Sequence, residues 1–397
     1  MFGIRFETPE PPPTPADVAG WFTSPPGLYL HIPFCRTICP FCPYNKVRYE
    51  PDLAARYVTG LHTEIAHHVS TMRGPFPSLY VGGGTPTMCL DELGGLIADL
   101  EIDGERAIEV LPAHMNADGA SRLAQLGFNY VSIGVQSFHG EVLHHLGRPG
   151  SPAQNRAAVE MALGRFDCVD VDLIFDVAYQ SPQILLDDLA LCFEYGVDQV
   201  STYPLMRFGY TPFGKARHDR RREHELLAEA QSLATERGYE RRSVWTFNRL
   251  GSGSYTSITR PYYLGMGAGA ATFAGRVFSV NHFGLTQYCE AATRGDLPVA
   301  RVAHLPRAAA AAYRAFWQAY TGALPVVPDD RLLNHPLSVA LVGLARATGL
   351  AHKDGESIVL SRSGYDRYHD LERWVTYHLI EPLWTEMMLE HDTENAA

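Results

Sequence analysis

The first half of the chain alternates short apolar runs, rich in β-branched residues, with longer stretches in which apolar residues recur at helical spacing. Residues 51–72 and 182–196 are typical of the longer stretches. This alternation predicts an α/β fold of βαβ units around a parallel sheet. Six units within about 180 residues favour a partial (β/α)6 barrel over a closed eight-stranded one. The predicted strands are residues 28–34, 78–84, 107–112, 130–137, 169–175 and 199–206.

Around the predicted barrel the pattern changes, and we divide the chain into four parts. Prolines crowd residues 1–27 and predict an extended arm lying on the body of the protein. The barrel takes residues 28–215, and residues 216–300 are expected to extend it and to line the substrate site. Residues 301–397 are mainly helical, and the stretch 344–371 predicts a helix, a β-wing and a helix. We therefore expect a small winged-helix-like C-terminal domain.

Composition narrows the class of protein. Hydrophobic residues make up 46% and charged residues 19% of the 397 residues, as in soluble globular proteins. The net charge of −11 argues against a nucleic-acid partner, and no apolar run is long enough for a membrane span. The N-terminus lacks a secretory pattern, and the seven cysteines are not spaced as a disulfide framework. We therefore expect a cytoplasmic protein.

Three of the seven cysteines lie in the stretch "HIPFCRTICPFCPYNK", residues 31–46. Cys35, Cys39 and Cys42 have the spacing C-x3-C-x2-C. A structural zinc site would need a fourth ligand, which is not evident nearby, because His31 belongs to the preceding predicted strand. An iron–sulfur cube normally takes four cysteines, so three would leave one iron with an exchangeable position. A ligand with an amine and a carboxylate could chelate that iron.

Other polar or glycine-rich positions fall at or near the carboxyl ends of the predicted strands. Catalytic side chains of parallel barrels lie at this edge. The sequence therefore predicts one site built from several strands. The positions are Cys35, residues 82–85, Glu109, Gln136, Asp172 and Tyr203.

The cysteine stretch resembles the radical S-adenosylmethionine superfamily, and "LYLHIPFCRTICPFCPYNK" is similar in particular to oxygen-independent coproporphyrinogen III oxidases and their relatives. Five further motifs occur in that family's order between residues 28 and 275: "LYVGGGTPT", "VSIGVQSF", "LHHLGRPG", "VDLIF" and "YYLGMGAGA". The resemblance implies a [4Fe–4S] cluster on the three cysteines whose open iron binds the amine and carboxylate of S-adenosylmethionine. One electron, implied to come from a flavodoxin- or ferredoxin-type donor, then cleaves the sulfonium C–S bond and yields a 5′-deoxyadenosyl radical.

The resemblance also implies which residues bind S-adenosylmethionine. By their places in the shared motifs they are Tyr29, Gly83, Gly84, Thr85, Gln136, Arg148 and Asp172, and Glu109, in the third predicted strand, could hold a ribose hydroxyl or the amino group of the cosubstrate. Taken without the resemblance, the glycines suit a tight turn, Glu109 an exposed strand end and Tyr29 a packed aromatic. We interpret Gly267, in "GMGAGA", as a position where the backbone packs closely against the site.

Two departures from the oxidases concern the substrate side. Tyr44 stands where the oxidases have a further cysteine, and we include it among the candidate catalytic residues with Cys35, Cys39 and Cys42. Residues 176–178 read "DVA" where the oxidases have Gly-Leu-Pro. The C-terminal part also matches the oxidases poorly. These differences put porphyrinogen decarboxylation in doubt.

The family also includes methyltransferases and cyclopropane-forming enzymes that bind two S-adenosylmethionine molecules, and we favour this function. One molecule would generate the radical, and the second would donate its methyl carbon to an sp2 carbon of a small-molecule natural product. A separate methyltransferase could finish the product. The acceptor is expected to be aromatic or unsaturated. Its pocket is expected among aromatic residues that could equally be ordinary core: Tyr203, Phe208, Tyr210, Trp245, Phe247, Tyr262 and Tyr263.

Two alternatives stay open. An oxidative decarboxylase of the coproporphyrinogen type would need several convergent basic residues for a polycarboxylate, and the candidates are Arg148, Arg207 and Arg260. A heme-trafficking protein would bind the cluster and S-adenosylmethionine without radical turnover.

Overall fold

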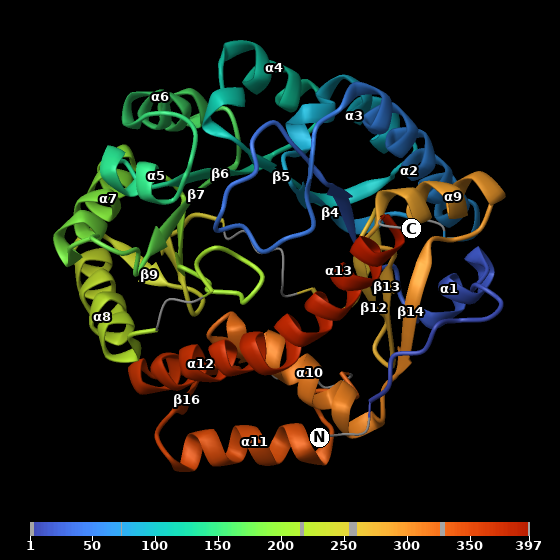
Figure 1. Cartoon of the computed structure of the whole chain (residues 1–397). Helices are drawn as coiled ribbons and strands as arrows, with labels where there is room; N and C mark the ends of the chain where they lie inside the picture. Colours follow the sequence, from blue (N-terminus) through green and yellow to red (C-terminus); the bar gives the residue numbers. More distant parts are fainter. Residues whose placement is uncertain (1–3, 73, 215–217, 254–259, 326–329, 396–397) are drawn as a thin grey trace.

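Six parallel strands form the centre of a twelve-stranded sheet that curves into an open barrel with helices on its outer side (Figure 1). The computed structural model describes residues 4–72, 74–214, 218–253, 260–325 and 330–395. The α/β partial barrel predicted from the sequence is therefore confirmed. The six strands are neighbours in chain order: β1 (Gly27–Ile32), β4 (Phe76–Gly83), β5 (Ile102–Val110), β6 (Tyr130–Gln136), β7 (Cys168–Phe175) and β8 (Gln199–Pro204).

Helices follow the strands as expected for βαβ units. They are α2 (Pro51–Thr71), α3 (Leu90–Ile97), α4 (Ala117–Gln125), α5 (Gly140–His145), α6 (Pro152–Ala162) and α7 (Pro182–Tyr195). Two short 3-10 turns, Pro86–Cys89 and Pro112–His114, follow β4 and β5. Among the described residues, none of the helices has the length and apolar character needed to cross a membrane.

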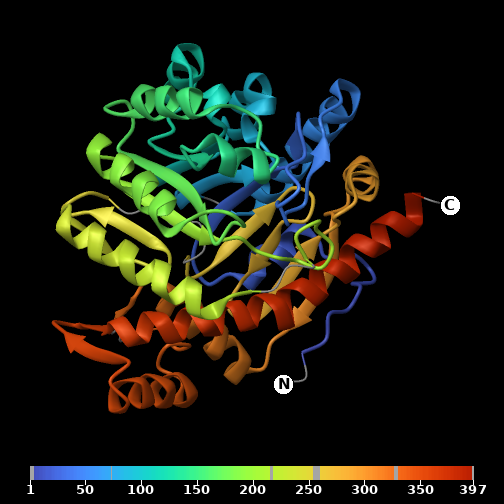
Figure 2. The ribbon, with the colours of Figure 1, turned by 60° about the vertical axis from the view of Figure 1, so that its left-hand side comes forward.

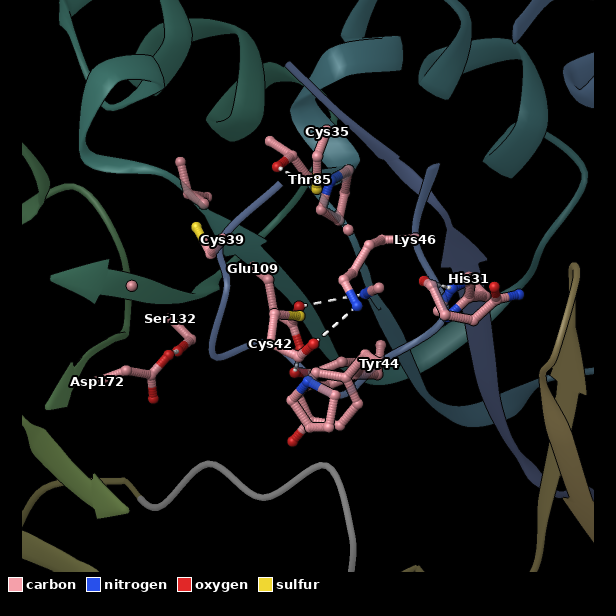
Figure 3. Close-up of a pocket in the computed structure, with 18 of the residues that line it drawn as sticks. His31, Cys35, Cys39, Cys42, Tyr44, Lys46, Thr85, Glu109, Ser132 and Asp172 are labelled. Atoms are coloured by element: carbon pink, nitrogen blue, oxygen red, sulfur yellow. Dashed lines mark hydrogen bonds between the residues drawn. The ribbon is translucent and has the colours of Figure 1, made fainter. Parts of the chain in front are cut away.

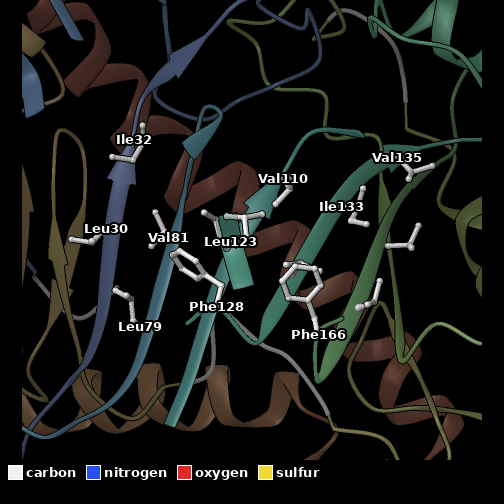
Figure 4. Packing of buried hydrophobic residues seen from close by; sticks show 14 of the residues in the cluster. Leu30, Ile32, Leu79, Val81, Val110, Leu123, Phe128, Ile133, Val135 and Phe166 are labelled. Carbon is white, nitrogen blue, oxygen red and sulfur yellow. The ribbon is translucent and has the colours of Figure 1, made fainter. Parts of the chain in front are cut away.

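Side chains alternate along the strands between the outer helices and the barrel interior. In β7, Val169 and Val171 are buried in the outer core, whereas Asp170 and Asp172 line an internal cavity. Burying one such apolar side chain stabilises the fold by about 1.5–3 kcal/mol. A one-residue slip would exchange the two sets, so the pairing register is strongly specified. Outer-core residues of the other strands in Figure 4 include Leu30, Ile32, Leu79, Val81, Val110, Ile133 and Val135.

The extension predicted from residue 216 onward adds strands to both edges of the sheet. On one side β11 (Tyr263–Met266) pairs parallel with β1, and antiparallel strands continue outward from it. On the other side an antiparallel pair follows β8. These outer strands are β12 (Ala271–Phe273), β13 (Val277–Asn281) and β14 (Val299–His304) on the first side, and β10 (Thr246–Arg249) and β9 (Tyr239–Arg241) on the second. Helices α8 (Arg220–Glu236) and α9 (Leu285–Arg294) belong to the same region.

The C-terminal part contains the predicted helix, β-wing and helix. They are α11 (Pro336–Ala347), the hairpin β16 (Ala351–Asp354) and β17 (Ser357–Leu360), and α12 (Arg362–Val375). Before them lie α10 (Arg307–Tyr320) and β15 (Ala323–Pro325), which pairs with β17. A π-helical turn, Thr376–Ile380, joins α12 to α13 (Glu381–Asn395), which runs across the open side of the barrel toward β12 and β13 (Figures 1 and 2).

The N-terminal arm is only partly the extended segment that its prolines predict. Its backbone bridges to β14 between Glu7 and Val302, as an extended arm would. It then forms a short helix, α1 (Pro15–Trp21), which corrects that prediction. Thr14 and Asp17 form a capping box at the start of α1. This local helix signal offsets the extended conformation that the prolines favour.

A buried contact ties α2 to the turn after β11, the "GMGAGA" stretch. The Tyr57 hydroxyl donates to the His31 carbonyl oxygen at 2.7 Å and accepts from the Ala268 N–H at 3.0 Å. Gly267 has φ +106°, and a Cβ there would lie 2.6 Å from both the His31 carbonyl oxygen and the Tyr57 hydroxyl. Close backbone packing at Gly267 is therefore present. Only glycine fits.

We predict that Tyr57→Phe lowers the free energy of unfolding by about 1–3 kcal/mol, because the His31 carbonyl and the Ala268 N–H lose their buried partner. Urea denaturation measures the change. The control is Tyr195→Phe, whose hydroxyl donates to Glu160 at the surface and whose loss should have little effect. Equal stability of Tyr57→Phe and the wild type would contradict the role of this contact.

Candidate active site

A cavity of about 840 Å3 occupies the barrel interior, and Figure 3 shows some of the residues that line it. Of the thirteen residues expected to be catalytic, to hold the cluster or to bind S-adenosylmethionine, all but Gly267 line it. The twelve are Tyr29, Cys35, Cys39, Cys42, Tyr44, Gly83, Gly84, Thr85, Glu109, Gln136, Arg148 and Asp172. Gly267 instead packs beneath the site on α2, and Gly269, two residues on, lines the cavity.

The cysteines belong to a loop that is closed at its base and supported by donors. Cys35 lies in β2 (Phe34–Cys35), which pairs with β3 (Val47–Arg48). Within the loop, the Cys42 N–H donates to the Cys39 carbonyl oxygen at 3.1 Å and Lys46 Nζ donates to the Cys42 carbonyl oxygen at 2.7 Å. Arg148 reaches the loop from beyond β6, with Nη1 3.4 Å from Cys39 Sγ.

The surroundings of Cys35 leave no space for larger neighbours. Its Sγ lies 3.6 Å from Thr85 Oγ1. A Cβ on Gly84 would lie 2.7 Å from the Pro33 carbonyl oxygen and 2.9 Å from Cys35 Sγ. Gly84 therefore lets the turn after β4 approach the Cys35 thiol.

These thiols suit a cluster better than a single metal ion. The described residues contain no group of three His, Cys, Asp or Glu side chains placed to share one ion. Thiolates that bind different irons of a cube need not converge on one point. Burial raises the pKa of the Cys35 thiol and raises that of Cys42 to about 11. A bound metal centre would take these residues as thiolates and release their protons.

His31 connects the cavity wall to the end of the cysteine loop. Its Nδ1 lies 2.8 Å from the Tyr29 hydroxyl and its Nε2 2.9 Å from the Asn45 carbonyl oxygen. Asn45 Nδ2 in turn donates to the carbonyl oxygens of Ala268 and Phe283 at 3.1 and 3.0 Å. Burial lowers the pKa of His31 to about 4, so its ring is neutral at pH 7. Both ring nitrogens have protein partners and position Tyr29 and the loop.

Two expected carboxyl groups face the cavity from neighbouring parts of the sheet. Glu109 accepts from the Tyr80 hydroxyl and from the Gly83 N–H, the latter at 3.2 Å. Burial and then the charge of Asp172 raise the pKa of Glu109 to about 8. Asp172 accepts from Ser132 Oγ at 2.8 Å, and burial raises its pKa to about 6. A cationic ligand beside them would favour their ionised forms.

Gln136 is held in an uncommon backbone conformation at the end of β6, with φ +70°. A Cβ on Gly134 would lie 2.9 Å from Arg148 Nη2 and 3.0 Å from Gln136 Nε2. The missing side chain lets Arg148 donate to the Gly134 carbonyl oxygen at 2.6 Å. Non-glycine residues at positive φ cluster at functional sites, and binding of S-adenosylmethionine by Gln136 stays a prediction.

The sequence did not indicate several cavity residues, of which Asp170 and Trp384 are examples. Asp170 is almost fully buried and accepts from Ser201 Oγ at 2.8 Å and Gln199 Nε2 at 3.0 Å. It precedes Asp172 by two positions, so the period of the strand could have indicated it. Trp384 of α13 also lines the cavity. Nothing local in the sequence indicates that contact.

The expected aromatic pocket is mostly core. Tyr203 and Tyr263 line the cavity, whereas five others do not: Phe208, Tyr210, Trp245, Phe247 and Tyr262. The expected basic residues divide in the same way. Arg148 and Arg260 line the cavity, but Arg207 is buried against Asp176, 2.8 Å from Nη1 to Oδ2. Arg36 and Lys46 line the cavity in its place.

Comparison with known proteins gives these residues a family context. The radical SAM superfamily model matches residues 29–189. Anaerobilin synthase from Escherichia coli O157:H7 is 32% identical over 217 residues, which cover 52% of this chain and 49% of that protein. The heme chaperone HemW from Lactococcus lactis is 26% identical over 287 residues, covering 68% of this chain and 75% of that protein. The matched region thus spans about half of the first relative's length.

The oxygen-independent coproporphyrinogen III oxidase from Escherichia coli K12 is 29% identical over 309 residues, covering 68% of this chain and 66% of that protein. A solved structure of the Escherichia coli enzyme superposes with a TM-score of 0.74 at 24% identity, over 87% of this chain and 88% of that chain. The barrel and the helical C-terminal part therefore share its fold. The preference for methyl or cyclopropane transfer has no support among these relatives, and the decarboxylase alternative fits them better.

We predict a pH-dependent stability difference between the wild type and Glu109→Gln. The pKa of Glu109 is about 8 in the folded protein and about 4.5 when unfolded, so between these values the folded state binds the extra proton. Stability contributed by this group is complete below pH 4.5 and is lost as the pH rises through 8. Glu109→Gln stays neutral and should lose less stability between pH 5 and pH 8.

Urea denaturation without added S-adenosylmethionine, at pH 5 and at pH 8, tests this expectation. Glu92→Gln on the exposed surface of α3 is the control and should follow the wild type. Parallel pH dependences of Glu109→Gln and the wild type would refute the buried, proton-binding state of Glu109.

Proposed function

Because residues 29–189 form a domain of the radical SAM superfamily, whose members use a [4Fe–4S] cluster and S-adenosylmethionine, we propose that this enzyme oxidatively decarboxylates a coproporphyrinogen-type substrate. The observation that carries the proposal is one cavity shared by the three loop cysteines and by cationic side chains that suit a polycarboxylate. The cations are Arg36, Lys46 and Arg148, whereas Arg260 also lines the cavity but is paired with Glu105.

The residues of this chain have distinct roles in the proposal. Cys35, Cys39 and Cys42 would hold the cluster, and Gly84 would keep the turn after β4 close to it. A [4Fe–4S] cluster held by these cysteines would supply the electron for reductive cleavage of S-adenosylmethionine, and the cosubstrate would supply the radical chemistry that removes a hydrogen atom from the substrate. Glu109 and Asp172 are acidic groups that would attract the sulfonium and amine charges.

In the proposed substrate step, a propionate side chain loses one hydrogen atom from the carbon next to the pyrrole ring. Its C–CO2 bond then breaks, releasing CO2 and leaving a vinyl group. One electron is left over and passes to a redox acceptor. The names of the relatives support this substrate class, since they refer to heme, coproporphyrinogen and anaerobilin.

We predict that replacing any of the three loop cysteines by Ala reduces the iron content to background and abolishes S-adenosylmethionine cleavage, because the cluster would lose one of three protein ligands. Iron analysis after anaerobic reconstitution measures the first effect, and 5′-deoxyadenosine yield measures the second. Cys289→Ala is the matched control, since Cys289 is half-buried outside the cavity. A loop variant that keeps full iron content and turnover would refute the assignment.

Incubation of the reconstituted enzyme with dithionite, S-adenosylmethionine and coproporphyrinogen III tests the reaction. We expect 5′-deoxyadenosine together with a product that has lost CO2 and gained a vinyl group, both detected by mass spectrometry. S-adenosylhomocysteine with a methylated acceptor would instead indicate carbon transfer and a second S-adenosylmethionine. Heme binding without 5′-deoxyadenosine would indicate heme trafficking. Either of these results would overturn the proposed decarboxylation.

A further inference from the structure

The helix that crosses the open side of the barrel is held at its beginning by the loop after β8. The π-helical turn that precedes it contains Tyr377, whose hydroxyl accepts from the Arg207 N–H at 2.9 Å. The Gly209 N–H donates to Glu381 Oε1, in the first turn of α13. π-Helical turns inside helices occur frequently at functional sites. Here the turn lies where the chain leaves α12 and begins to cross the cavity (Figures 1 and 2).

The same helix is also held on the other side of the cavity. Met387 is buried with Val280 of β13 and with Phe283, and Leu383 packs against them. Helix α13 is therefore supported by both edges of the barrel. This two-sided support gives Trp384, between the two contacts, a defined position over the cavity.

Trp384 belongs to an aromatic group formed by three segments that are distant in sequence. One is the cysteine loop, whose Tyr44 ring lies 6.0 Å from Trp384 at 59°. Another is the loop after β8, whose Phe208 ring stacks on Trp384 at 6.0 Å and 12°. The Tyr210 hydroxyl donates to the Pro43 carbonyl oxygen at 3.1 Å and joins this loop to the cysteine loop. This aromatic group forms a wall of the cavity, which connects the cysteine loop to the C-terminal helix.

The exposure of these rings distinguishes a binding surface from core. Phe208 is 3% exposed and supports the wall from behind, whereas Tyr44 is 55% exposed although it lines the cavity. The rest of the lining combines apolar surface with a few charged groups, including Glu109, Asp172 and Arg148. An exposed aromatic surface in a largely apolar cavity with a few charged groups is suited to a flat π system that carries polar substituents.

We propose that Tyr44 and Trp384, whose rings contact each other, form one aromatic surface, the aromatic clamp, which packs against a pyrrole-type ring of the substrate and makes helix α13 part of the specificity-determining surface. The inference rests on the proposed function for the identity of the ring. It assigns Tyr44, which stands at the position where the oxidases have a cysteine, to substrate binding. Both residues lie beside the cluster loop, so a ring held there would be near the radical source.

The test uses coproporphyrin III, a stable oxidised analogue, titrated into the anaerobic full-length holoenzyme and followed by its absorbance. We expect Trp384→Ala and Tyr44→Ala each to raise the dissociation constant about tenfold, the loss of one strong aromatic contact. Trp384→Phe should recover most of the affinity, because a ring remains. Iron content and thermal unfolding verify that each variant is folded and loaded.

Trp374→Ala is the matched control. Trp374 lies in α12, is 41% exposed, stacks on His378 and does not line the cavity. Its removal should leave the dissociation constant unchanged. Unchanged binding in both clamp variants, or equal weakening in Trp374→Ala, would overturn the clamp.

Absence of binding by the wild type would overturn the assignment of a tetrapyrrole to the clamp. A separate measurement tests the proposed reaction. The absence of 5′-deoxyadenosine or of the vinyl product would contradict it. A clamp that binds coproporphyrin III in an enzyme that does not decarboxylate would therefore leave this inference standing while the proposed function fails.

Discussion

The two-sided character of the parallel strands is the constraint on which the rest of the structure depends. Side chains of one strand alternate between a dry outer core beneath the helices and an inner cavity. Val169 and Val171 fill the first, and Asp170 and Asp172 reach the second. The helices and the site therefore cannot be varied independently. A shift in register that buried the acids against α7 would also expose the valines to the cavity.

Burying polar groups inside a barrel costs free energy unless each of them has a hydrogen-bond partner. The carboxyl groups of this cavity meet that requirement with hydroxyl, amide and backbone donors, such as Ser132 for Asp172 and Gly83 for Glu109. These neutral donors do not cancel the effect of burial on the two carboxyl groups, and the pKa values of Glu109 and Asp172 remain raised. The interior is thus satisfied in its hydrogen bonds and still electrostatically suited to a cationic ligand. That combination agrees with a sulfonium cosubstrate.

The cysteine loop obtains its shape from contacts far away in the sequence. His31 and Asn45 connect it to the turn after β11, and Arg148 reaches it from the segment after β6. Tyr44 meets a helix more than three hundred residues later. The loop therefore depends on the barrel, its extension and the C-terminal helices together. A change in this distant helix can therefore alter the surroundings of Tyr44 without altering the three loop cysteines.

The sequence by itself determined the six parallel strands, because the period of apolar residues reports which side chains are buried locally. It also determined the three cysteines and the strand-end residues Glu109, Gln136 and Asp172, because parallel strands bring their carboxyl ends to one edge. The tertiary structure alone decided that Arg207 pairs with Asp176 and that Gly267 supports α2. It also brought Trp384 over the cavity. These contacts join segments with no shared period or motif, so only the folded chain specifies them.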